Sequence, residues 1–309
     1  MYIQSIRLKN FGQFIDAEIN FNYANDKPIS LISGENASGK TILVNAIKWC
    51  FWGKEEFHDK NMLNDQVKKE MQLGDKCSAE IEIVFIFNNK IYTLKRENTY
   101  KLVEFKNLFS SQELSLSYVD KSGTKYVIEN QNIQNELETI LPSYLNELIF
   151  LTDSNYNFSK TTSNEIKFIL ELCEKYSLDG RKMMEDNINN YFYMVYPERN
   201  IKINIIENNI NYSLPAEQAI FLAFVFRLSV RDILKHIKDN YDSKIELFPI
   251  VLDSIFGYFD SYNSEKILIL FKKLSEQVII LSTEHCFNFD IKKRIIDYIN
   301  TDFKLETIK

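Results

Sequence analysis

The chain of 309 residues has little glycine and proline, eight and five residues respectively, and it contains four cysteines. This composition excludes collagen-like and low-complexity chains, which are rich in glycine or proline. The cysteines lie far apart and form no pair with metal-ligand spacing: Cys50, Cys77, Cys173 and Cys286. We therefore expect reduced core cysteines of a cytosolic protein, with neither a disulfide framework nor a zinc site.

Long hydrophobic runs are also missing. The longest apolar run, Ala219–Phe226, ends at Arg227 and is far shorter than the roughly 18 residues that a membrane-spanning helix needs. The N-terminal residues Met1–Arg7 form no apolar signal core, so nothing predicts export. We therefore expect a cytoplasmic protein without a membrane partner.

Positive charge is not in excess. The chain has 37 Lys and Arg residues against 43 Asp and Glu residues, which gives a net charge of -6. A protein that holds nucleic acid by bulk positive charge is excluded, so any contact with DNA has to come from a local groove or from a partner. A hydrophobic share of 45% with 26% charged residues is typical of a globular chain, long enough for one large or two small domains.

Strand and helix patterns alternate along the chain. The first half predicts a strand before the turn at 10–12, an apolar strand at 28–33, a hairpin of 79–87 and 90–96, and strand-like pieces over 102–128. It predicts helices at 40–52, 131–140 and 163–193, the last interrupted at Gly180. The final third predicts strands at 201–206, 247–252 and 278–281 and helices at 215–238 and 264–274. This alternation indicates an α/β fold, in which helices pack on a sheet.

One motif carries specific chemistry. The segment Gly34-Glu35-Asn36-Ala37-Ser38-Gly39-Lys40-Thr41 matches G-x-x-x-x-G-K-[ST] and lies between an apolar strand and a helix. Its glycines let the loop curl so that backbone N–H groups and the helix N-terminus face a phosphate. We expect this loop, with Ile42, to bind a nucleoside triphosphate, Lys40 reaching the β- and γ-phosphates and Thr41 binding Mg²⁺. The alternative is a glycine loop that only connects the strand to the helix. That alternative does not explain why residues 34–41 match the whole phosphate-binding motif between a strand and a helix.

A second strand ends in a carboxylate. Asp253 follows the apolar run 248–252 and can hold Mg²⁺ through water. An aspartate at the end of a strand is also common as a helix cap, so Asp253 alone is ambiguous. It follows Thr41 by 253 − 41 = 212 residues, too many for a small GTPase core but enough for a lobe between the two motifs.

These motifs resemble the heads of SMC-type and RecF-type ABC ATPases. The resemblance rests on Ile6-x-Leu8-x-Asn10-Phe11, on the phosphate loop, on Ala46-Ile47 and on Phe51-Trp52-Gly53. The segments Asp253–Ser261 and Glu276–Glu284 are similar to the DndD branch, the ATPases of bacterial DNA phosphorothioation and restriction systems. The resemblance implies a P-loop ABC/SMC-type head: a mixed sheet, antiparallel hairpins in the N-terminal lobe and a short helical insertion.

The same resemblance implies a division of the chain and further site residues. It gives an N-terminal lobe at 1–153, a helical insertion at 154–190 and a C-terminal lobe at 191–309. Asp153 takes the place of the Q-loop glutamine and joins Thr41 and Asp253 as a ligand of Mg²⁺. Arg7 is implied to approach the nucleotide, and the implied cofactors are ATP and Mg²⁺.

Three departures from the family pattern bear on activity. Only residues 154–190 stand where the family has a long coiled-coil arm. The signature L-S-x-G-[EQ] aligns best with Leu214–Gln218, where Pro215 offers neither a hydroxyl nor an N–H, so that the helix dipole and Gln218 remain to face a partner's γ-phosphate. Ser254 follows Asp253 where many ABC ATPases have the glutamate that orients the attacking water, a role worth about 10²–10⁴ in rate.

Glu284 and Asp153 are the candidates to replace that glutamate, although an exposed loop glutamate is commonly just solvated. Thr283 stands roughly where a switch histidine would, and His285 comes slightly too late. We expect slow hydrolysis, with Lys40, Asp253 and Glu284 as the catalytic residues.

Some prominent residues are expected to be structural instead. Arg96 ends a strand of the predicted hairpin and is expected to form an ion pair. Trp49 and Trp52 lie at helical spacing and are expected to be core aromatics.

Two functions fit the sequence. In the first, two heads sandwich two ATP–Mg²⁺ as a homodimer, hydrolyse slowly, and act in prokaryotic DNA modification, repair or anti-phage defence. A separate nuclease or effector partner is then needed, because the sequence holds no nuclease motif. In the second, favoured by Pro215 and Ser254, the chain is an ATP-gated scaffold that hydrolyses little and regulates an effector. A metabolic P-loop kinase fits poorly, because the clustered arginines of a substrate lid are missing.

Overall fold

The computed structural model describes residues 1–22, 27–53, 62–104, 106–152, 162–198, 202–206, 209–211, 214–242, 245–271, 277–286, 293 and 296–305. The chain divides into two compact units. The first comprises Met1–Tyr23, Ile32–Ser143 and Thr301–Lys309, and the second comprises Ala24–Leu31 and Tyr144–Asn300. Among the described helices, none has the length and apolar content that crossing a bilayer requires.

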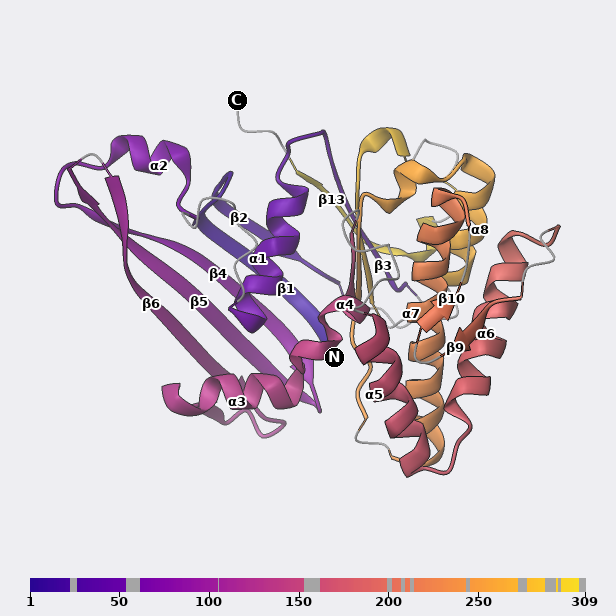
Figure 1. Ribbon diagram of the computed structural model, residues 1–309. Coiled ribbons are helices and arrows are strands. Elements are labelled where there is room, and N and C mark those ends of the chain that lie inside the picture. The colour runs from indigo at the N-terminus through magenta and orange to yellow at the C-terminus, as the bar shows by residue number, and fades with distance from the viewer. Residues whose placement is uncertain are drawn as a thin grey trace. The chain divides into compact units, whose positions relative to one another are not determined.

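The first unit is built on a six-stranded antiparallel sheet with the order β2-β1-β4-β5-β6-β7 (Figure 1). Its strands are β1 Tyr2–Phe11, β2 Phe14–Asn20, β4 Lys76–Phe87, β5 Lys90–Val103, β6 Lys106–Val119 and β7 Lys125–Val127. The predicted hairpin is confirmed, because β4 and β5 pair up to Phe87 and Lys90. Its turn residues Asn88 and Asn89 both have positive φ, which asparagine tolerates better than most residues.

Helices cover one face of this sheet. Every second residue of β4 is buried on that face, namely Ala79, Ile81, Ile83 and Phe85. Helix α1 (Lys40–Trp52) packs there, with Trp49 against Phe11 and Phe51 against Phe85 at ring distances of 5.6 and 5.5 Å. Helix α3 (Asn130–Ile140) lies on β6, and a short helix α2 covers Asp65–Glu70. The buried position of Trp49 is as predicted.

Arg96 is buried on the same face, with 4% of its surface exposed. Its Nε donates to the carbonyl of Cys50 at 3.1 Å, near the C-terminal end of α1. Its two other nitrogens donate to the amide oxygens of Gln112 and Gln134 at 3.2 and 3.4 Å. The structural role is confirmed, but its partners among the described residues are neutral oxygens rather than the expected carboxylate. Burial lowers the pKa of Arg96.

The second unit contains the parallel strands β8 (Phe150–Leu151), β11 (Ile250–Asp253) and β12 (Val278–Ser282). They belong to a sheet of order β13-β3-β12-β11-β8, and the first residues of β3 (Ile29–Gly34) and β13 (Ile299–Leu305) lie in this unit. Antiparallel and parallel sheets in one chain confirm the α/β fold class with its mixed strand directions.

The described helices of this unit are α4 Asn146–Ile149, α5 Thr162–Lys175, α6 Gly180–Val195, α7 Ala216–Asn240 and α8 Ser261–Phe271. A hairpin of β9 (Asn204–Ile206) and β10 (Asn209–Asn211) precedes α7. The predicted helical segment 163–193 is therefore two helices, as the interruption at Gly180 indicated. A Cβ at Gly180 would lie 2.7 Å from the side chain of Cys173, so glycine permits α6 to begin against α5.

Candidate nucleotide-binding site

The phosphate loop runs from the end of β3 at Gly34 to the start of α1 at Lys40. The N–H of Ser38 donates to the carbonyl of Glu35 at 3.1 Å and closes the turn. Ala37 and Gly39 have φ values of 64° and 97°, so the backbone curls through the left-handed region twice. Glu35, Asn36 and Ala37 are exposed at the outside of this curl. The loop therefore has the conformation that the motif predicts.

Both motif glycines lie where a side chain would collide. A Cβ at Gly34 would overlap Ser38 Oγ and lie 3.1 Å from Leu305 Cβ. A Cβ at Gly39 would lie 2.7 Å from the ring of Phe14 and 2.9 Å from Gln13 Oε1. Contacts this short require a neighbour to move, so the close packing of the loop explains both glycines.

Lys40 places its ammonium group inside the loop. Its Nζ donates to the carbonyl oxygens of Gly34 at 2.8 Å and Glu35 at 2.6 Å, and it lies 3.5 Å from Ser38 Oγ. The side chain is 7% exposed. A buried positive charge therefore lies at the centre of the curl, where an anion bound by the loop would meet it.

The N-terminus of α1 fits an anion as well. Gly39 is its N-cap, and within the described part of the chain no side chain caps this end and no acidic residue lies in the first turn. The partial positive charge of the helix and its first N–H groups thus lie beside the Lys40 ammonium. Thr41 is exposed on this first turn. The residues present fit a phosphate group with a bound cation.

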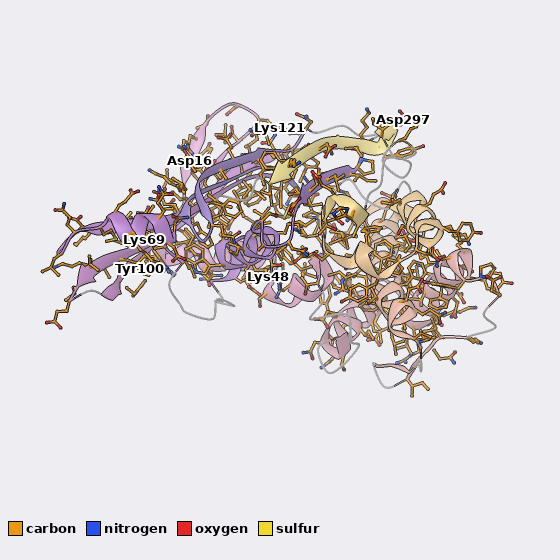
Figure 2. All side chains as sticks on the ribbon, turned by 90° about the horizontal axis from the view of Figure 1, so that it is seen from above. Asp16, Lys48, Lys69, Tyr100, Lys121 and Asp297 are labelled. Carbon is orange, nitrogen blue, oxygen red and sulfur yellow. The ribbon has the colours of Figure 1, made fainter. Side chains whose placement is uncertain are left out.

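Arg7, which was expected to approach the nucleotide, lies in β1. It forms a two-point ion pair with Asp16, with N–O distances of 3.1 and 3.2 Å, and both side chains are about half exposed. Alternation along β1 places Arg7 on the face opposite the buried Ile6 and Leu8. Figure 2 labels Asp16 and, in α1, Lys48. The hydrogen bond from Arg7 lowers the pKa of Asp16, so this pair is explained without a nucleotide, and a role of Arg7 in binding stays a prediction.

Asp253 is the last residue of β11 and is 4% exposed. Ser254 follows with φ of 59°, its N–H bonded to the carbonyl of Leu281 at 2.9 Å and its Oγ donating to Asp253 Oδ1 at 3.1 Å. A serine in the left-handed region costs about 1 kcal/mol or more. The next helical turn, Ile255–Tyr258, has Ser254 at its N-cap, so Asp253 is not the cap of that turn.

The signature segment leads into α7, whose N-cap is Pro215 and makes no side-chain capping bond. Gln218 is 6% exposed, and its Oε1 has no hydrogen-bond partner among the described residues. Glu217, its neighbour in the signature segment, accepts hydrogen bonds from Tyr196 and Asn263 at 2.7 and 3.0 Å. No local pattern indicated these two partners, because they are 21 and 46 residues away in sequence.

The remaining predicted residues are Asp153, Glu284 and His285. Asp153 lies outside the described residues. Glu284 and His285 are exposed in a short helical turn, Glu284–Cys286. Thr283 Oγ1 lies 3.1 Å from Cys286 Sγ. The loop with Lys40 and Thr41 belongs to the first unit, whereas Asp253, Gln218 and Glu284 belong to the second, so one shared site stays a prediction. No cluster of three His, Cys, Asp or Glu side chains suited to a metal occurs among the described residues.

A curled G-x-x-x-x-G-K-T loop between a buried strand and a helix, in a chain that also carries a parallel sheet with a buried terminal aspartate, defines a P-loop ATPase head. The chain belongs to the AAA_23 family, described as an AAA domain, whose model matches residues 5–300.

Curated relatives match part of the chain. The SbcC component of the nuclease SbcCD from Staphylococcus aureus strain MRSA252 is 29% identical over 135 residues, which is 40% of this chain and 13% of that protein. The same protein from strain JH9 is 28% identical over 135 residues, which is again 40% of this chain and 13% of that protein. The chain thus covers 13% of the length of these relatives.

Solved structures match nearly the whole chain at low identity. The SMC head bound to the C-terminal winged-helix domain of ScpA covers 95% of this chain and 92% of its own, with a TM-score of 0.61 and 16% identity. The SMC head domain from Thermotoga maritima covers the same shares with a TM-score of 0.51 and 16% identity. The fold of the chain is that of an SMC head.

Proposed function

We propose that this chain binds ATP–Mg²⁺ at residues 34–41, pairs with a second copy, and hydrolyses ATP slowly as an SMC/ABC-type head. The observation that carries the proposal is the position of Lys40, whose ammonium lies buried inside the curled loop at the N-terminus of α1. A buried ammonium and an uncapped helix end favour a multiply charged phosphate over a neutral ligand.

In this proposal the loop binds the phosphates, and Thr41 together with Asp253 binds Mg²⁺. The backbone N–H groups of the curl bind phosphate oxygens, and Lys40 exchanges its carbonyl partners for the β- and γ-phosphates. The hydroxyl of Thr41 and the carboxylate of Asp253 bind Mg²⁺, together with water and phosphate oxygens, because this cation prefers oxygen ligands and retains part of its water. Asp153 is proposed as a further ligand from the family resemblance alone.

Slow hydrolysis follows from the residue after Asp253. Ser254 has no group that can accept a proton from water at neutral pH, and its hydroxyl donates to Asp253. A general base contributes about 10²–10⁴ in rate, so turnover depends on another carboxylate. We propose Glu284 for this role, since it follows strand β12, the neighbour of β11.

The setting is proposed to be DNA repair, modification or anti-phage defence, with a separate nuclease or effector. The matching relatives are by name components of a nuclease, and the DndD-like C-terminal segments point to DNA modification and restriction systems. The net charge of -6 leaves DNA binding to a local groove or to the partner.

An ATP-gated scaffold is the second candidate. It is favoured by Pro215, which gives α7 no capping hydroxyl, and by the Ser254 hydroxyl bonded to Asp253. In this function ATP closes a dimer that restrains an effector, and turnover is negligible.

The test compares ATP turnover and ATP-dependent dimerisation of the wild type with those of Lys40→Ala and Glu284→Gln. Lys69→Ala, an exposed lysine on α2, is the charge-matched control (Figure 2). We expect Lys40→Ala to lose both properties and Glu284→Gln to lose turnover but still dimerise. Dimerisation without turnover in the wild type would favour the scaffold. Dimerisation of Lys40→Ala at the wild-type level would contradict the assigned site.

A further inference from the structure

Helix α6 lies along α7 in the second unit (Figure 1). Two tyrosine hydroxyl groups, one in α6 and one just past its end, contact α7. Tyr191 donates to Asp232 in the middle of α7, and Tyr196, just past the end of α6, donates to Glu217 in the first turn of α7. Helix α6 therefore begins within residues 154–190, which stand in place of a coiled-coil arm, and its C-terminal end contacts the signature helix α7.

Glu217 joins three elements. Its Oε1 accepts from Tyr196 Oη at 2.7 Å and from Asn263 Nδ2 of α8 at 3.0 Å. The N–H of Asn263 donates to Asp260 Oδ1 at 2.7 Å, which fixes the start of α8. Helix α8 begins shortly after Asp253, the last residue of β11. The Glu217 carboxylate therefore connects the signature helix α7 to the segment that follows Asp253.

Tyr196 is held firmly in this place. Its ring packs against Phe192 and Phe221 with centroid distances of 5.3 and 5.5 Å, and 8% of the residue is exposed. Burial and the hydrogen bond to Glu217 raise the pKa of Tyr196, so its hydroxyl remains a donor across the physiological range. Lys266 of α8 donates to the carbonyl of Val195 at 3.1 Å and fixes the adjoining end of α6.

Within the described part of the chain, no side-chain capping bond stabilises the first turn of α7. Pro215 at the N-cap makes no side-chain capping bond, and the first backbone bond of the turn runs from the Ala219 N–H to the Pro215 carbonyl at 2.9 Å. A capping side chain at the N-cap would otherwise stabilise this turn. The hydrogen bonds to Glu217 instead connect this turn to Tyr196 and to α8.

We propose that Tyr196 is a positioning residue: through Glu217 it holds the first turn of α7 in the orientation that meets the nucleotide of the second copy. This inference rests on the proposed function, in which that turn faces the γ-phosphate across the dimer. Tyr196 itself touches no nucleotide. Its effect passes through Glu217 and α7.

The chain provides a matched control in Tyr191. Both tyrosines donate to a carboxylate of α7, and both phenylalanine variants remove one hydroxyl without changing the packing of the ring. Asp232 lies 232 − 217 = 15 residues beyond Glu217, which is about 22 Å along a helix at 1.5 Å per residue. Loss of the Tyr191 bond should therefore weaken the helix pair without disturbing the first turn.

The experiment measures thermal stability, ATP affinity, ATP-dependent dimerisation and kcat for wild type, Tyr196→Phe and Tyr191→Phe. We expect similar melting temperatures for the two variants and unchanged ATP affinity of the single chain. We expect dimerisation and kcat to fall about tenfold in Tyr196→Phe alone, the effect of one hydrogen bond to a charged group. Equal kcat and dimerisation in the two variants would overturn the positioning role while leaving Lys40-dependent ATP binding intact.

A second measurement does not depend on ATP. Backbone hydrogen exchange at 217–220 should be faster in Tyr196→Phe than in Tyr191→Phe, because the first turn of α7 loses its support in the former. Equal exchange in both variants would overturn the inference by itself. A wild type that shows no Lys40-dependent ATP binding would instead contradict the proposed function and the coupling to the nucleotide.

Discussion

Replacing Gly39 with alanine tests the packing of the phosphate loop. The backbone at Gly39 has φ of 97°, and a Cβ there would lie 2.7 Å from the ring of Phe14. A residue other than glycine in this region costs about 1–3 kcal/mol. Phe14 is itself buried in the first unit, so its ring has little room to move, and such overpacking costs about 1–3 kcal/mol more.

These two effects together predict a loss of about 2–6 kcal/mol, a large part of the roughly 5–15 kcal/mol that stabilises a typical domain. Gly74→Ala separates them. Gly74 has φ of 95°, almost the same as Gly39, but among the described residues nothing lies within 4 Å of its added Cβ. Gly74→Ala should therefore show the backbone cost alone.

Urea unfolding followed by tryptophan fluorescence suits this test, because the two tryptophans, Trp49 and Trp52, both lie in α1, the helix that follows the loop. We expect Gly39→Ala to unfold at clearly lower urea than Gly74→Ala, and to lose ATP affinity as the loop opens. Equal unfolding midpoints for the two variants would refute the close packing of Gly39 against Phe14.

Two further predictions concern the first unit. Arg96→Met should destabilise the unit by about 2–4 kcal/mol, because the Cys50 carbonyl loses its donor in a buried place and two partly buried amide oxygens lose theirs, whereas Arg7→Ala should leave the urea midpoint unchanged because its ion pair is exposed. The two midpoints measured side by side check this, and equal losses would contradict it. Burial raises the pKa of the Cys50 thiol from 9.0 to about 12, so the unfolded chain ionises first. Stability that is complete below pH 9.0 should fall as the pH rises towards about 12, and Cys50→Ala should reduce that slope. An unchanged slope in Cys50→Ala would show that other groups determine it.

Much of the fold followed from local sequence signals. The apolar strand, the glycine loop and the helix after it are encoded by adjacent residues, and the hairpin at Asn88-Asn89 depends on two residues that tolerate positive φ. Gly180 marked the break between α5 and α6, since only a glycine fits against Cys173. Such features are set within a few residues, which is why sequence reasoning reaches them.

The contacts that sequence reasoning missed join residues far apart in the chain. Glu217 meets Tyr196 and Asn263, which lie 21 and 46 residues away, and Arg96 meets Cys50 46 residues away. An arginine in a strand is expected to pair with a carboxylate, because opposite charges attract. The partner of Arg96 is instead the backbone carbonyl of Cys50, near the end of α1. The packing of whole helices and strands determines which distant residues become hydrogen-bond partners. A local sequence pattern therefore cannot predict them.

Equilibrium binding of a fluorescent ATP analogue with Mg²⁺ shows most directly whether residues 34–41 bind ATP. We expect saturable binding by the wild type and by Lys69→Ala, and an affinity at least about tenfold lower for Lys40→Ala, which loses a charged contact to the phosphates. Binding by Lys40→Ala with the affinity of the wild type would contradict ATP binding at this loop.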